Sequence, residues 1–246
     1  MSPGAESRRL PIWAILPVKQ IDAAKQRLSN VLSAAERQEL FRNMLADFML
    51  AISQAKLLAG LLVVTRDVEV QALVRKYGAR LLLTDTDDGQ SAAVTAGASM
   101  LAREGVSSII TLAGDVPLMT ATEIDTVCRS LAAAPAVTIV PSYDETGTNS
   151  IACSPPRIIP FMFGESSLPR HLCAAHEHGV KPRVLRLTGM ALDIDVVSDL
   201  AQLLRYETTT ATQRLLIANG IAQRLEPQQM RAPGYADADV DSQVKQ

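Results

Sequence analysis

Three aspartates, in two segments of the chain, have the residue type and the spacing of metal ligands. Asp115 directly follows the apolar run Ser108 to Leu112, while Asp193 and Asp195 stand two residues apart in an extended segment. Residues i and i+2 of an extended chain project to the same side, so both carboxylates can reach one cation. Carboxylate oxygens suit Mg²⁺. We therefore expect a magnesium site here, with a turn or helix cap as the alternative role for Asp115.

Basic residues gather after the first predicted strand. That strand ends at Pro17, and Lys19, Lys25 and Arg27 follow it in a segment that has the pattern of a loop. Several cations beside free backbone N–H groups suit a triphosphate, which needs donors spread over its oxygens. The alternative is a solvated turn, because lysine and arginine are common on surfaces.

A second candidate anion site lies near the start of a later predicted helix. Gly164 to Ser167 precede that helix, and its first turns carry Arg170 and His171. Backbone N–H groups at a helix start, with hydroxyls and cations beside them, suit a phosphate or a carboxylate. An ordinary N-cap by Ser166 or Ser167 is the alternative.

Histidine spacing argues against a zinc site on this helix. His171 and His178 share one helix face, but His176 points about 140° away from His171. The three side chains therefore do not converge on one metal.

The predicted elements place these residues at one edge of a sheet. Short apolar runs without a polar face predict buried strands, and amphipathic segments between them predict helices. Such alternation gives one α/β domain, with a mostly parallel sheet, helices on both faces and ligands beyond the carboxyl ends of the strands. The predicted strands are Ile12–Val18, Leu61–Thr65, Arg80–Leu83, Ser108–Leu112, Val137–Val140, Ser150–Cys153 and Arg183–Leu187; the predicted helices are Ala34–Lys56, Val68–Tyr77, Ser91–Arg103, Ala121–Ala133, Ser167–His178, Ser198–Arg205 and Ala211–Leu225.

Composition excludes several classes of protein. The 246 residues are 48% hydrophobic, and 24 basic against 26 acidic residues give a net charge of −2, so we expect neither a nucleic-acid nor a membrane partner. No apolar run approaches the roughly 20 residues of a membrane span. The N-terminus has the pattern of a strand, not of a signal peptide, and three distant cysteines suit a cytoplasmic protein. We expect an extension over 1–10, a catalytic domain over 11–205, and a C-terminal helix with a polar, disordered tail over 206–246.

Five segments resemble one family in order and approximate spacing. ILPVKQIDAAKQRLS, LAGDVPLMT, GTNSIAC, FGESSLPRHLCAA and LDIDVVSDL are similar to motifs of the 2-phospho-L-lactate guanylyltransferase (CofC) family. The resemblance implies a fold like that of nucleotide-diphospho-sugar transferases. It also implies transfer from GTP to a small phosphorylated carboxylic acid, with Mg²⁺, during coenzyme F-420 biosynthesis.

The resemblance also implies roles for individual residues. Thr148, Gly164 and Ser167, with Arg170 and His171, would hold the acceptor acid. Mg²⁺ would lie on the three aspartates, and Lys19, Lys25 and Asp115 would be catalytic. The residues implied to contact the nucleotide are Pro17, Lys19, Lys25, Arg27, Asp88, Gly89 and Ser91.

One segment departs from the family pattern. Where the family usually has Gly-Leu-Asn, this chain has Gly89-Gln90-Ser91. A more polar lining favours 3-phospho-D-glycerate over phosphoenolpyruvate and 2-phospho-L-lactate, because its extra hydroxyl needs a partner. The alternatives are a molybdopterin guanylyltransferase-like enzyme, a cytidylyltransferase, or a regulator that binds a nucleotide without catalysis. Sheet edges and the C-terminal helix are compatible with a homodimer.

Overall fold

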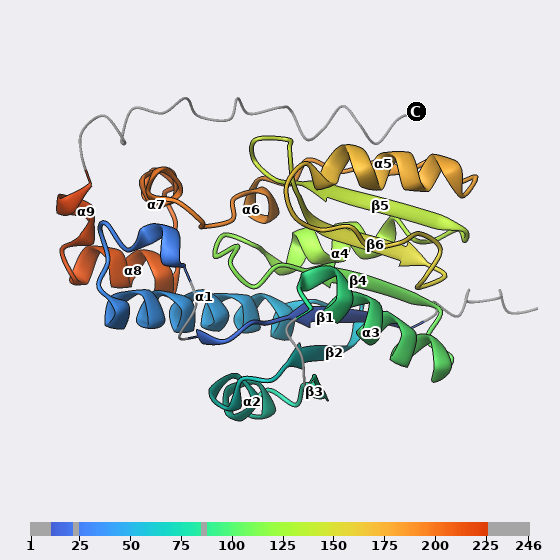
Figure 1. The fold of residues 1–246 in the computed structure, drawn as a ribbon, viewed down its shortest axis with the longest axis horizontal. Helices are drawn as coiled ribbons and strands as arrows, with labels where there is room; N and C mark the ends of the chain where they lie inside the picture. Colours follow the sequence, from blue (N-terminus) through green and yellow to red (C-terminus); the bar gives the residue numbers. More distant parts are fainter. Residues whose placement is uncertain (1–10, 22–24, 85–87, 226–246) are drawn as a thin grey trace, which may run out of the picture.

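The computed structural model describes residues 11–21, 25–84 and 88–225; the predicted extension over 1–10 and the tail from residue 226 lie outside this part. Within it, seven strands form a single sheet in the order β3-β2-β1-β4-β6-β5-β7 (Figure 1). The strands are β1 (Ile12–Pro17), β2 (Leu58–Thr65), β3 (Arg80–Leu83), β4 (Ser108–Leu112), β5 (Ala136–Pro141), β6 (Thr148–Ser154) and β7 (Arg183–Val184).

The sheet is mostly parallel, as predicted. Strand β1 pairs in parallel with β2 and β4, β2 with β3, and β5 with β7. Strand β6 alone among the described strands runs the other way, because it pairs antiparallel with both β4 and β5. Its first residue therefore lies at the edge where the other strands end.

Each face of the sheet carries its own core, because successive strand residues point to opposite sides. On one face, Ala14 and Leu16 of β1 join a cluster with helices α1 (Ala34–Gln54), α2 (Val68–Arg75) and α4 (Ala121–Arg129). On the other, Ile15 joins a cluster with α3 (Gln90–Arg103) and α5 (Ser167–Glu177). The single α/β domain with helices on both faces is thus confirmed.

Helices α1 and α4 each begin with a capping box. The hydroxyl of Ser33 accepts a hydrogen bond from the Glu36 N–H, and the Glu36 carboxylate accepts one from the Ser33 N–H. Thr120 and Glu123 repeat this arrangement at the start of α4. These reciprocal bonds satisfy N–H groups that have no partner inside the helix, so they fix where α1 and α4 begin.

A third apolar cluster lies at the end of the molecule where α1 begins (Figure 1). Helices α6 (Thr188–Ala191), α7 (Val197–Leu203), α8 (Ala211–Ala218) and α9 (Ile221–Arg224) follow β7. Leu215, Leu216 and Ile221 are buried there together with Leu28 and Leu32. The last two helices are therefore packed into the domain.

Several elements differ from their predicted bounds. The single helix expected over 211–225 is divided by Gly220, whose φ of 64° is left-handed and ends a helix. Strand β2 begins three residues early, because Leu58 already pairs with Ile12 of β1. A short 3-10 helix, η2 (Gln26–Leu28), replaces the predicted loop, since Leu28 is drawn into the third cluster. Among the described helices, none combines the length and apolar content that a membrane span requires.

Candidate active site

A cleft of about 880 Å³ opens at the carboxyl ends of β1, β2 and β4. The reversed strand β6 adds its first two residues, Thr148 and Asn149, to the same cleft. Most of the predicted site residues line it: Pro17, Lys19, Lys25, Arg27, Asp88, Gly89, Asp115, Thr148, Gly164, Ser167, Asp193 and Asp195. The topology thus brings together cations, carboxylates and the segment predicted to hold an acceptor, which are far apart in the sequence.

A buried ammonium group joins two of the aspartates. Lys25 Nζ lies 2.5 Å from Asp115 Oδ2 and 2.7 Å from Asp195 Oδ1, and its side chain is only 8% exposed. Burial alone would lower the pKa of Lys25, but the two carboxylates outweigh it and raise the pKa above its usual value. Lys25 is therefore a fixed positive charge held against carboxylates, not a side chain extended into the cleft.

The third aspartate has a different environment. Burial, followed by the neighbouring charges of Asp115 and Asp195, raises the pKa of Asp193 to about 6. Asn149 Nδ2 donates to Asp193 Oδ1 over 3.1 Å and to the Ala191 carbonyl over 2.8 Å. Asn149 thus orients the Asp193 carboxylate, although the spacing argument did not single out this asparagine.

The donor set fits a divalent cation. Among the described residues, no group of three or more His, Cys, Asp and Glu side chains has the arrangement of a complete metal site. Mg²⁺ does not require one, because it usually takes one or two protein carboxylates and completes its shell with water and substrate phosphates. Lys25 neutralises only one of the three carboxylate charges at Asp115, Asp193 and Asp195. The remaining negative charge and hard oxygens suit Mg²⁺.

Helices α3 and α5 begin at the cleft without a side-chain cap. The N-cap of α3 is Gly89, with φ 87°, and that of α5 is Ser166, with φ 51°. At α3 the first-turn N–H groups remain available to an anion, and the helix dipole favours negative charge there. At α5 the Ser167 N–H is the available donor of the first turn, because the Leu168 N–H donates to the Thr146 carbonyl and Pro169 has no N–H. Helices α1, α2, α4 and α8 instead use side-chain caps, supplied by Ser33, Asp67, Thr120 and Thr210.

The turn between β5 and β6 is fixed by its own polar groups. Asp144 Oδ1 accepts from the Ser142 hydroxyl over 2.6 Å and from the Thr146 N–H over 3.0 Å. Burial raises the pKa of Asp144, but the hydrogen bonds that it accepts lower the pKa by a larger amount. The pKa of Asp144 therefore lies below its usual value. The Thr146 carbonyl accepts from the Leu168 N–H of α5 over 3.1 Å. The turn therefore holds Thr148 beside the start of α5.

His171 is completely buried behind Thr148 and does not line the cleft. Burial and the adjacent Arg170 charge lower its pKa to about 4, so the ring is neutral at pH 7. Its Nε2 accepts from the Met162 N–H over 2.8 Å, which leaves the proton on Nδ1 to donate to Thr148 Oγ1 over 3.1 Å. The Thr148 hydroxyl proton is then free to donate to a ligand.

Two further predicted site residues, Ser91 and Arg170, also do not line the cleft. The Ser91 hydroxyl accepts from the Phe163 N–H over 2.9 Å. Arg170 donates to the carbonyls of Glu165 and Ser166. Both side chains therefore hold the Phe163–Ser166 segment, which itself lines the cleft.

Sequence reasoning missed several residues at the cleft. Arg66 directly follows β2, at a carboxyl end where an α/β sheet is expected to bind ligands, so its position was a usable signal. Its guanidinium donates to Gln20 over 2.9 Å. Asp199 accepts from the N–H groups of Asp195 and Val196, each over 2.8 Å. It follows Asp195 by four residues, but no sequence signal separates it from an ordinary helix cap.

Known proteins resemble this chain in sequence and in fold. A phosphoenolpyruvate guanylyltransferase of Roseiflexus castenholzii is 36% identical over 206 residues, which are 84% of this chain and 94% of that protein. A 3-phospho-D-glycerate guanylyltransferase of Colwellia psychrerythraea is 29% identical over 82% of this chain and 94% of its own length. A Desulfovibrio desulfuricans structure described as a nucleotide-diphospho-sugar transferase has a TM-score of 0.70 at 16% identity, covering 87% of this chain and 97% of that one.

The family model described as "Guanylyl transferase CofC like" matches residues 12–231. That span contains the three aspartates, Lys25 and both uncapped helix starts, and it extends beyond residue 205 through α8 and α9. The chain therefore belongs to the CofC-like guanylyl transferase family.

Proposed function

We propose that the protein transfers the guanylyl group of GTP to a small phosphorylated carboxylic acid and releases pyrophosphate. The observation that carries the proposal is the cleft itself, which combines a buried ammonium and three aspartates with two uncapped helix starts. One reactant is a triphosphate and the other is a phosphorylated acid, so the site needs two groups of anion donors. The family and the relatives support this reaction class.

The nucleotide binds where the exposed cations line the cleft. Lys19, Arg27 and Arg66 all line it, and their positive charges suit the phosphates of GTP. Lys25 is held between Asp115 and Asp195, so its charge is already in place when negative charge builds on the departing pyrophosphate. A fixed charge of this kind stabilises the transition state without a cost of reorganisation.

Asp193 and Asp115 would hold Mg²⁺, which would supply positive charge that neutralises the triphosphate. Asn149 keeps the Asp193 carboxylate oriented by its hydrogen bond, and Asp199 keeps the backbone at Asp195 in position. Asn149 and Asp199 thus fix the direction in which the carboxylates of Asp193 and Asp195 point.

The acceptor binds at the start of α5. Its acid groups take the N–H group of Ser167 and the hydroxyl of Thr148, which His171 orients. An oxygen of its phosphate then attacks the α-phosphorus of GTP in line, and the bond from that phosphorus to the bridging oxygen of the leaving pyrophosphate breaks. No protein nucleophile is needed, so catalysis rests on positioning and charge.

The acceptor is a three-carbon phosphorylated acid. Sequence reasoning favoured 3-phospho-D-glycerate because of Gln90 and Ser91, but the Ser91 hydroxyl is engaged by Phe163 and does not line the cleft. The 36% identical relative is named for phosphoenolpyruvate, against 29% for the relative named for 3-phospho-D-glycerate. We therefore place phosphoenolpyruvate first and the biosynthesis of coenzyme F-420, in the cytoplasm, as the setting.

Pyrophosphate release tests the reaction and its substrate together. The protein is incubated with Mg²⁺ and GTP, and phosphoenolpyruvate, 3-phospho-D-glycerate and 2-phospho-L-lactate are offered separately, with ATP and CTP as nucleotide controls. Release with GTP and phosphoenolpyruvate alone is the expected result. Release with CTP in place of GTP would contradict the guanylyl assignment, and GTP binding without release for any acid would favour a non-catalytic regulator.

A further inference from the structure

The residues that carry Lys25 and Arg27 rest on the C-terminal end of the chain. We define residues 25–33 as the Lys25 segment and α8 with α9 as the C-terminal brace. Leu28 and Leu32 of the segment are at most 1% exposed. They belong to the third apolar cluster, which also includes Leu215, Leu216 and Ile221 of the brace. The apolar side of the Lys25 segment is therefore covered in part by residues nearly 200 positions later in the sequence.

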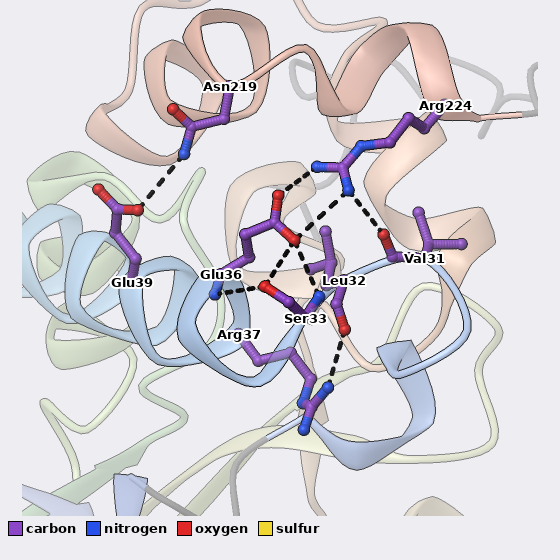
Figure 2. Close-up of polar contacts among 8 residues, drawn as sticks. All are labelled: Val31, Leu32, Ser33, Glu36, Arg37, Glu39, Asn219 and Arg224. Atoms are coloured by element: carbon purple, nitrogen blue, oxygen red, sulfur yellow. Dashed lines mark hydrogen bonds and ion pairs between the residues drawn. The ribbon is translucent and has the colours of Figure 1, made fainter.

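Polar contacts fix the same segment in register. Arg224 donates to the Val31 carbonyl over 3.0 Å and pairs with Glu36, whose Oε1 lies 2.5 Å from Arg224 Nη2 (Figure 2). Glu36 in turn accepts from the Ser33 N–H over 2.8 Å. One guanidinium of the brace thus reaches both the backbone of the segment and Glu36, the partner of Ser33 in the capping box of α1.

Lys25 needs such support, because its backbone is in the left-handed region with φ 54°. A lysine in that region is disfavoured, and the surrounding structure has to maintain it. The Leu28 N–H donates to the Lys25 carbonyl, so movement at Leu28 is transmitted directly to Lys25. A shift of this backbone would separate the Lys25 ammonium from Asp115 and Asp195, whose side chains belong to other segments.

We propose that the C-terminal brace sets the position of the Lys25 ammonium in the active site, with Arg224 as the positioning residue through which it acts. Arg224 does not line the cleft, so it acts on catalysis through the Lys25 segment and touches no reactant. The expected effect on turnover rests on the proposed function, whereas the expected effect on the mobility of the Lys25 segment does not.

Hydrogen exchange and kinetics on the full chain separate these two consequences. Arg224→Ala is compared with Arg224→Lys, which keeps the charge, and with Asn219→Ala, a control at the C-cap of α8 whose contact is with Glu39, outside the Lys25 segment (Figure 2). Exchange is followed by mass spectrometry at the amides of Leu28, Val31 and Leu32, which are bonded within the segment. Turnover and the KM values for GTP and the acceptor are measured alongside the melting temperature.

For Arg224→Ala we expect about tenfold faster exchange in the Lys25 segment and about tenfold lower kcat, with the acceptor KM unchanged. Arg224→Lys should recover part of both effects, and Asn219→Ala should match the wild type. Wild-type exchange in the segment of Arg224→Ala would overturn the proposal, even if kcat fell. Faster exchange with unchanged kcat would also overturn it.

The proposal can still be tested if a variant does not fold or if the wild type is inactive. If Arg224→Ala does not fold, Glu36→Gln weakens the same pair while keeping an oxygen for the Ser33 N–H, and the same exchange result is required of it. If the wild type turns over no acid, the proposed function fails, and the brace is then judged by exchange alone.

Discussion

The role of a single residue at this cleft depends on the groups that it contacts as much as on its residue type. Lys25 is a clear case, because its ammonium is bound to Asp115 and Asp195 and cannot move freely to follow a substrate. His171 is another, because it is neutral, buried and bound to Thr148. Both residues were selected from the sequence by chemical type, but only the structure shows that one is fixed on carboxylates and the other acts from behind the cleft wall.

Lys25→Met removes the fixed charge but keeps a side chain of similar length. We expect kcat to fall by about 100-fold or more, because removal of a preorganised charged donor typically costs this much. Steady-state pyrophosphate release measures the loss, and circular dichroism shows whether the fold is kept. Lys181→Met, at an exposed lysine outside the cleft, is the matched control and should retain full activity. An equally active Lys25→Met would remove Lys25 from the mechanism.

Thr148→Val replaces the hydroxyl with a methyl group of similar size. The acceptor KM should rise about tenfold, because one hydrogen bond to an anion is lost, while the KM for GTP stays the same. Thr148→Ser restores the hydroxyl and should restore the acceptor KM. An increase in the KM for GTP instead would mean that the two substrate positions are exchanged.

At the scale of elements, the strands and helices were the most predictable part of the molecule. The apolar runs at β1, β3 and β4 and the starts of α1 and α4 appear in the structure where the sequence indicated them. The reversal of β6 was not predictable, because a short apolar strand has the same pattern in either direction. The division of α8 from α9 depends on Gly220 and on packing against distant residues.

Asp47 shows how one helix fixes the start of another. Its carboxylate, on α1, accepts from the N–H groups of Ala211 and Thr212 over 2.7 and 2.9 Å and from the Thr212 hydroxyl over 2.6 Å. We expect Asp47→Ala to lower the free energy of unfolding by about 1–3 kcal/mol, because these donors lose a charged partner. Urea unfolding measures the change. Glu39→Ala, on the same helix but exposed, should stay within about 0.5 kcal/mol; an equal loss there would contradict a specific role for Asp47.

At the scale of the whole molecule, the site is an assembly of segments that the sheet brings to one edge. The residues that follow β1 and β4 were predicted to meet there, because parallel strands end together. The contribution of residues 163–167 depends on the path of the chain after β6, and that of residues 193–199 on its path after β7. Sequence periodicity does not contain that information. The five motifs pointed to these segments, but their distances required the fold.

Stability of the whole fold should depend on pH through His171. Its pKa in the folded state is about 4, against the ordinary value of 6.5, so the unfolded chain binds more protons between these values. His171 therefore makes the fold less stable as pH falls from 6.5 to 4, by at most about 1.4 kcal/mol per pH unit. Asp193, with a raised pKa, acts in the opposite direction between its ordinary 3.8 and about 6. Urea unfolding of the wild type and His171→Gln at pH 5 and pH 7 isolates the histidine, because Asp193 is common to both. Equal pH dependence in the two proteins would contradict the assignment.

The reversed strand β6 has a consequence for how this enzyme class diversifies. Because β5 and β6 form a hairpin, both ends of the 142–147 turn leave the sheet at the cleft edge. The turn can gain, lose or exchange residues without any change in the path of the chain through the sheet, and its contact with the start of α5 carries such a change to the place where we propose that the acceptor binds. If the acceptor binds there as proposed, exchange of this one short turn would change acceptor specificity and leave the residues proposed to bind the nucleotide unaltered.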